Sequence, residues 1–131
     1  MLGLDTNVLV RFLVRDHESQ FERARRLIKR EVDAKEKVLV SLLVLLETEW
    51  VLRSRYGMRK TQIVEVISGL LDAAELEVED EPTVEEALYI WKDSVGDFAD
   101  CLIGARHRRL GCRATATFDA KAVKLPGFVT A

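Results

Sequence analysis

The chain has 131 residues, of which 48% are hydrophobic and 32% are charged, and its formal net charge is −2 at pH 7. This is typical of one soluble globular domain, which we place at residues 1–131. No apolar run is long enough to span a bilayer, and no signal-type segment opens the chain, so we expect a cytoplasmic protein with no membrane contact. The charge neither predicts nor excludes nucleic acid as a partner. The two cysteines, Cys101 and Cys112, lack metal-type spacing and are expected to be buried thiols.

A short apolar strand, Leu2–Leu4, opens the chain and stops at Asp5. A helix is expected from Val8, with Thr6 or Asn7 as its N-cap. A second helix is expected over 18–35, where apolar residues recur at helical spacing. Basic residues occupy the other faces of this helix. We expect them to form a solvated surface, and the alternative is a patch that binds phosphates. These residues are Arg23, Arg25, Arg26, Lys29 and Arg30.

Further along, strands alternate with pairs of helices, a pattern typical of a parallel sheet with helices on both faces. The expected strands are 38–41, 76–78, 112–118 and 128–129. The expected helices are 42–56, 62–74 capped by Thr61, 84–93 with a Thr83–Glu86 capping box, and one from Asp97 to Gly111. Within the last helix, Gly104 is expected to allow a close approach to a neighbour.

Two acids, Asp5 and Asp119, follow predicted strands directly. Each alone is readily explained as a turn residue. Because the carboxyl ends of parallel strands meet at one edge of a sheet, where ligands bind, two acids there suggest a shared site.

Glu47 is predicted to lie on an apolar helix face with Leu43 and Trp50 and to have no basic partner one turn away. Ionised groups are rarely buried without a partner or a metal, so Glu47 is a functional candidate. Glu49 has Arg53 four residues later, and a surface ion pair explains it.

Asp97 and Asp100 begin the helix at Phe98. Asp97 fits an N-cap, and the helix dipole favours an acid at Asp100. Their like charges nevertheless oppose each other unless a cation lies nearby. We therefore expect Asp100 to face the sheet edge.

Several carboxylates in one crevice suit Mg²⁺ or Mn²⁺, which prefer hard oxygen ligands. Such a metal lowers the pKa of a bound water and neutralises charge on a phosphate, which suits phosphodiester hydrolysis. The chain has no Ser-His-Asp arrangement, P-loop or zinc spacing.

With these motifs in this order, the chain resembles PIN-domain ribonucleases, specifically the VapC-type toxins of toxin–antitoxin pairs. The motifs are Leu4-Asp5-Thr6-Asn7, the helix of Glu47 followed by Trp50 to Gly57, Asp97-Phe98-Ala99-Asp100, and Thr117-Phe118-Asp119. The resemblance implies a three-layer α/β/α sandwich with a mostly parallel central sheet of four to five strands. It also implies a Mg²⁺- or Mn²⁺-dependent endoribonuclease that cuts transfer or ribosomal RNA, forms a homodimer and is blocked by a protein antitoxin.

Carried over by position, the resemblance makes the acidic residues catalytic and metal-binding and gives polar neighbours a supporting role. The catalytic and metal residues are Asp5, Glu47, Asp100 and Asp119, and the supporting residues are Thr6, Asn7, Asp97 and Thr117. Arg11, Arg53 and Arg55 are candidates for contacting the RNA backbone.

Two alternatives remain open. One is a PIN-like interaction domain without activity, which should lack one of the site acids. The other is a receiver-like signalling module with an acidic pocket, which should have adjacent acids after its first strand and a lysine after a late one.

Overall fold

The computed structural model describes residues 1–131 as six α-helices, five short strands and one 3-10 helix. The order of helices and strands is the predicted one throughout, with the 3-10 helix η1 (Ala122–Lys124) added between the last two strands. The chain divides into two compact units, residues 1–79 and residues 80–131. None of the helices combines the length and apolarity needed to cross a membrane.

A three-stranded parallel sheet organises the N-terminal unit. It consists of β1 (Leu2–Gly3), β2 (Val38–Val40) and β3 (Leu76–Val78), with β2 in the middle. Val38 and Val40 are completely buried, as expected for a central parallel strand. Since all three strands are parallel, their carboxyl ends lie at the same edge.

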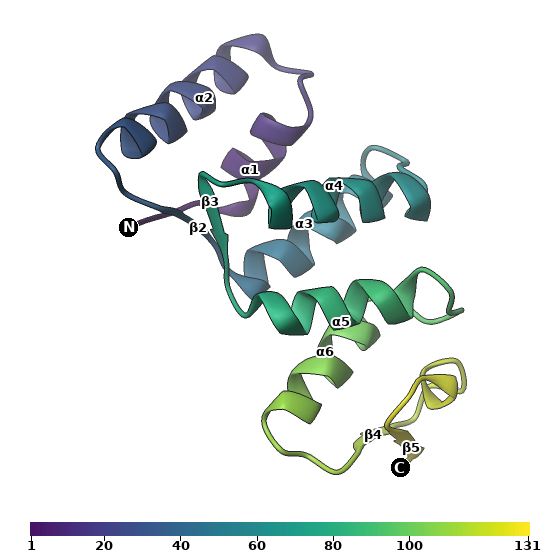
Figure 1. Cartoon of the computed structure of the whole chain (residues 1–131). Helices are drawn as coiled ribbons and strands as arrows, with labels where there is room; N and C mark the ends of the chain where they lie inside the picture. Colours follow the sequence, from purple (N-terminus) through teal and green to yellow (C-terminus); the bar gives the residue numbers. More distant parts are fainter. The chain divides into compact units, whose positions relative to one another are not determined.

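Four helices surround this sheet. Figure 1 shows α1 (Thr6–Leu13) beside α2 (Glu18–Asp33), and these two helices contact each other. Helix α1 also contacts α3 (Leu42–Ser54), while α4 (Lys60–Asp72) contacts β3. The core consists of aliphatic side chains at helical spacing, among them Leu9, Leu45, Leu52, Ile63 and Ile67, each less than 2% exposed.

The C-terminal unit is built on α5 (Glu81–Trp91) packed against α6 (Phe98–Arg109). The rings of Trp91 and Phe98 lie 5.1 Å apart. A parallel pair of strands, β4 (Thr115–Thr117) and β5 (Phe128–Thr130), completes the unit. A Cβ atom on Gly104 would lie 2.6 Å from the Phe128 ring, so glycine permits α6 to pack closely, as the sequence predicted.

Asp80 ties the start of α5 to the end of α6. Its carboxylate accepts a hydrogen bond from the Thr83 hydroxyl at 2.6 Å and forms ion pairs with Arg106 at 2.9 Å and Arg109 at 3.6 Å. The Thr83 hydrogen bond and these two arginines hold the pKa of the Asp80 carboxyl below its usual value. The predicted Thr83–Glu86 capping box was wrong, because α5 begins at Glu81 and Glu86 instead pairs with Arg108.

Other predicted details also differ from the structure. Backbone pairing joins β1, β2 and β3 in one sheet and β4 and β5 in another, instead of joining all strands in one. Helix α4 begins at Lys60, and the Arg59 N–H bonds the Gln62 side chain at 3.0 Å, so Thr61 is not the cap. The strand predicted at 112–118 covers only 115–117. Both cysteines were expected to be buried, and Cys101 is buried, but Cys112 is exposed.

Candidate functional site

Asp5 is exposed at the carboxyl end of β1 and is itself the N-cap of α1. Its Oδ1 accepts a hydrogen bond from the Val8 N–H at 2.9 Å. The prediction that Thr6 or Asn7 caps this helix was therefore wrong. Capping fixes one carboxylate oxygen, whereas Oδ2 accepts no hydrogen bond within the protein and can meet a ligand.

Thr6 links Glu47 to the start of α1. The Thr6 hydroxyl, on a buried residue, donates a hydrogen bond to Glu47 Oε1 on α3. The two residues are 41 positions apart in the chain, so the fold brings Glu47 next to the residue that follows Asp5. Asp5, Thr6 and Glu47 thus form the first acidic group, with Thr6 positioning Glu47.

The prediction that Glu47 lies on a buried apolar face of its helix was wrong. Glu47 nevertheless contacts Thr6, the residue that follows Asp5. Glu47 is exposed, and its apolar neighbours Leu43 and Trp50 are 80% and 50% exposed. Glu49 is the buried acid, only 2% exposed, and it pairs with Arg53 at 2.9 Å. The predicted ion pair between Glu49 and Arg53 is present. Only Arg53 lies at the surface, because the Glu49 carboxylate is buried.

Asp97, Asp100 and Asp119 form the second acidic group, in the C-terminal unit. Asp97 is the N-cap residue of α6, and Asp100 lies half-buried in its first turn. Burial raises the pKa of the Asp100 carboxyl, and the negative charges of Asp97 and Asp119 raise it further. None of the three forms an ion pair within the protein, so their repulsion is not compensated.

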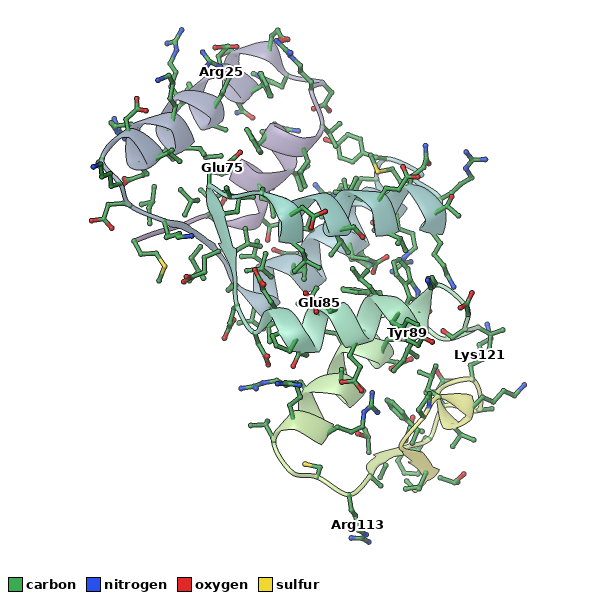
Figure 2. The ribbon with its side chains drawn as sticks, in the orientation of Figure 1. Arg25, Glu75, Glu85, Tyr89, Arg113 and Lys121 are labelled. Atoms are coloured by element: carbon green, nitrogen blue, oxygen red, sulfur yellow. The ribbon has the colours of Figure 1, made fainter.

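The turn after β4 fixes Asp119. The Asp119 N–H donates to the Thr117 hydroxyl at 3.0 Å, and Asp119 Oδ1 accepts from the Lys121 N–H at 2.8 Å. Lys121 is labelled in Figure 2. Thr117 therefore shapes the turn that presents Asp119, which agrees with a supporting role.

The chemistry of these side chains fits a hard divalent cation. Both groups offer carboxylate and hydroxyl oxygens, and the unbalanced charge around Asp100 is what a cation would relieve. Within either unit, no cluster of three or more His, Cys, Asp or Glu side chains is arranged to hold a metal ion. Mg²⁺ typically takes one or two carboxylates directly and keeps several waters, so the carboxylates of either group are enough in number for such an ion.

The predicted RNA-binding arginines have different surroundings. Arg11 is held by Gln20 at 2.6 Å and by Tyr56 at 3.0 Å, so it joins α1 to α2 and to the end of α3. Arg53 pairs with Glu49, and Arg55 is exposed at the C-cap of α3.

A cleft between α1 and α2 was not singled out from the sequence. It has a volume of about 470 Å³, and its lining runs from Asp5 and Asn7 on α1 to arginines on α2. The only sequence indication was the basic surface of α2, for which a phosphate patch was the alternative interpretation.

These features define an α/β domain whose parallel strands are followed by exposed carboxylates. Residues 3–127 match the PIN domain family, and the chain belongs to this family. The predicted PIN-like α/β fold is thereby confirmed. The chain is also similar to a VapC ribonuclease of Aquifex aeolicus (strain VF5), with 29% identity over 127 residues that cover 97% of this chain and 93% of that protein.

Proposed function

We propose that this protein is a Mg²⁺- or Mn²⁺-dependent endoribonuclease and the toxin of a toxin–antitoxin pair. The observation that carries the proposal is Asp100 in a PIN domain, a half-buried carboxyl beside the carboxylates of Asp97 and Asp119, none of which pairs with a basic side chain. The similarity to a VapC ribonuclease supports RNA as the substrate. We propose Asp5, Glu47, Asp100 and Asp119 as the catalytic residues of this protein.

A bound Mg²⁺ or Mn²⁺ lowers the pKa of its water and neutralises charge on the scissile phosphate. The protein's own part is to hold carboxylates in place before RNA arrives. A hydrogen bond from Thr6 orients Glu47, and a hydrogen bond from the Val8 N–H orients Asp5. The Thr117 hydroxyl shapes the turn that holds Asp119. Such prior positioning accelerates hydrolysis because the groups need not be ordered during the reaction.

The partners are proposed from the resemblance to VapC-type toxins. An RNA of the transfer or ribosomal class is the substrate, a protein antitoxin blocks the site, and the protein acts in the cytoplasm. The exposed Leu43 and Trp50 on α3 support a homodimer, because apolar side chains of this size favour burial against another chain. The apolar side chains of α4 do not support a homodimer, because Ile63, Ile67 and Leu70 are already buried within this chain.

The direct test is cleavage of total RNA by the purified protein and by an Asp5→Asn variant. Asparagine caps a helix about as well as aspartate, so the variant should keep its melting temperature. We expect cleavage to fall on the order of a hundredfold or more, because Asp5 contributes a negative charge at the metal. A folded Asp5→Asn protein that cleaves RNA at the wild-type rate would remove Asp5 from the site.

Metal dependence has a readout that does not involve RNA. Mn²⁺ or Mg²⁺ should raise the melting temperature of the wild-type protein, because the ion relieves repulsion around Asp100. An Asp100→Asn variant should melt higher than wild type in EDTA and respond less to the ion. If EDTA leaves cleavage intact and the ions leave the melting temperature unchanged, metal dependence is refuted.

The alternatives give different results in these experiments. An inactive PIN-like interaction domain would cleave no RNA under any metal condition, although this chain retains all of the predicted site acids. Membership of the PIN domain family argues against the receiver-like module.

A further inference from the structure

We infer that the cleft between α1 and α2 is a docking site for the RNA backbone, with Arg23 and Arg30 as its phosphate-binding residues. This inference rests on the proposed ribonuclease function and identifies where the substrate is held. It concerns a surface that lies wholly within the N-terminal unit.

The cleft concentrates positive charge on a chain whose net charge is −2. Four arginines line its volume of about 470 Å³, while Asp5 is its single acid. The arginines are Arg11 on α1 and Arg23, Arg26 and Arg30 on α2. A basic groove of this kind attracts phosphates and can follow a nucleic-acid backbone.

Two of the four cleft arginines are already paired with acids. Arg26 lies 4.0 Å from Glu22, and Arg11 lies 3.4 Å from Asp16. Outside the cleft, Arg25 pairs with Glu22 at 3.0 Å and Lys29 pairs with Asp33 at 2.8 Å. Arg23 and Arg30 form no ion pair with the protein, although both are exposed. Arg23 and Arg30 are thus the cleft arginines that remain available to an anion.

The spacing on α2 suits an extended ligand. Arg23, Arg26 and Arg30 stand at positions i, i+3 and i+7, so they share one helix face. At a rise of 1.5 Å per residue, Arg23 and Arg30 are separated by about 10 Å along the helix, enough to contact more than one phosphate. The rest of the lining consists of the amide side chains of Asn7 and Gln20 and the apolar side chains of Val8, Ala24 and Leu27.

The position of the cleft connects it to the proposed chemistry. It extends from the junction of the two helices, where Arg11 meets Gln20, to Asp5 at the start of α1. A strand of RNA held by Arg23 and Arg30 would therefore run toward the carboxylate that we place in the active site. An acidic protein segment would not need to reach Asp5, which is why we favour RNA.

The test compares two double variants of equal charge. Arg23→Gln/Arg30→Gln removes the two unpaired cleft arginines, and Arg25→Gln/Lys29→Gln removes two paired bases outside the cleft on the same helix. Arg25 is labelled on α2 in Figure 2. All four positions are exposed, so both proteins should fold, which a thermal melt checks. Arg11 is left unchanged because its contacts hold α1, α2 and Tyr56 together.

Binding is measured first, without cleavage, by the fluorescence anisotropy of a labelled RNA stem–loop in EDTA at several salt concentrations. We expect the cleft variant to bind on the order of tenfold more weakly, and its salt slope to fall by about 1.5, since each phosphate contact contributes about 0.7 to 0.9. The control variant should stay within about twofold of wild type. Equal weakening of both variants would overturn the inference, because general charge would then explain it.

Cleavage is measured second, in Mg²⁺, on the same stem–loop. The cleft variant should show a raised KM with little change in kcat, as expected for lost substrate binding. If the cleft variant binds and cuts RNA like the control but loses affinity for a polyglutamate peptide, the cleft docks an acidic protein and the inference is wrong. If wild-type protein binds RNA through the cleft and never cuts it, the ribonuclease proposal fails and the docking site stands.

Discussion

Glu47 and Glu49 stand two residues apart on α3 and have opposite surroundings. Glu47 is exposed and bonded to Thr6, while Glu49 is buried and paired with Arg53. Glutamine substitution should therefore separate activity from stability. We expect Glu47→Gln to reduce RNA cleavage strongly and leave the free energy of unfolding nearly unchanged.

The matched change, Glu49→Gln, should do the reverse. It neutralises a buried carboxylate that bonds Arg53, which lowers the free energy of unfolding by about 1–2 kcal/mol. Cleavage by the folded fraction should be retained. Urea unfolding and RNA cleavage measured on both variants check this, and a Glu49→Gln protein that is stable but inactive would move the catalytic role to Glu49.

At this scale the sequence indicated the candidate acids through their positions at strand ends and in the first turn of a helix. Asp5 and Asp119 were chosen because both follow strands, and the structure shows both exposed, Asp5 as the N-cap of α1 and Asp119 in the loop after β4. The sequence could not show that α3 turns Leu43 and Trp50 outward, because an apolar face is the same pattern whether it meets the core or another chain. Nor could it show the Thr6–Glu47 contact, which depends on how α1 packs against α3.

Among the helices, α6 depends on a glycine for its packing. The missing side chain of Gly104 leaves space for the Phe128 ring of β5. Gly104→Ala should destabilise the protein by about 1–3 kcal/mol, because the added methyl forces the ring or the helix to move. The comparison is Gly69→Ala in α4, where nothing lies within 4 Å of the added atom.

Gly69→Ala should stabilise the protein by about 0.5–1 kcal/mol, since alanine favours a helix more than glycine. Thermal melts of the two variants should therefore shift in opposite directions from wild type. A rise in melting temperature for both would mean that Phe128 yields readily and that α6 does not depend on the close approach.

The order of helices and strands was predictable because apolar periodicity and glycine or proline breaks are local properties. The ends of the helices were less predictable where the capping residue depends on tertiary structure. Asp80 adopts a left-handed backbone with φ of 53° and bonds Thr83, so α5 starts earlier than the Thr83–Glu86 pattern suggested. The pairing of strands into two sheets is likewise set by tertiary packing and not by any strand's own sequence.

For the molecule as a whole, the proposed catalytic acids are Asp5 and Glu47 in the N-terminal unit and Asp100 and Asp119 in the C-terminal unit. If RNA cleavage requires all of these acids, losing either pair should abolish it, and losing both pairs should add nothing. Residues that act together show this strong non-additivity. Two independent sites would instead give effects that add.

We therefore expect Asp5→Asn, Asp119→Asn and the double variant to lose RNA cleavage to similar extents. The Mn²⁺-induced rise in melting temperature should also be lost in each single variant and should not fall further in the double variant. A Thr61→Ala variant, changed at an exposed position of α4, serves as the control for both measurements. If each single variant keeps part of the Mn²⁺ response and the double variant loses the sum, Asp5 and Asp119 act independently and their joint role in the reaction is refuted.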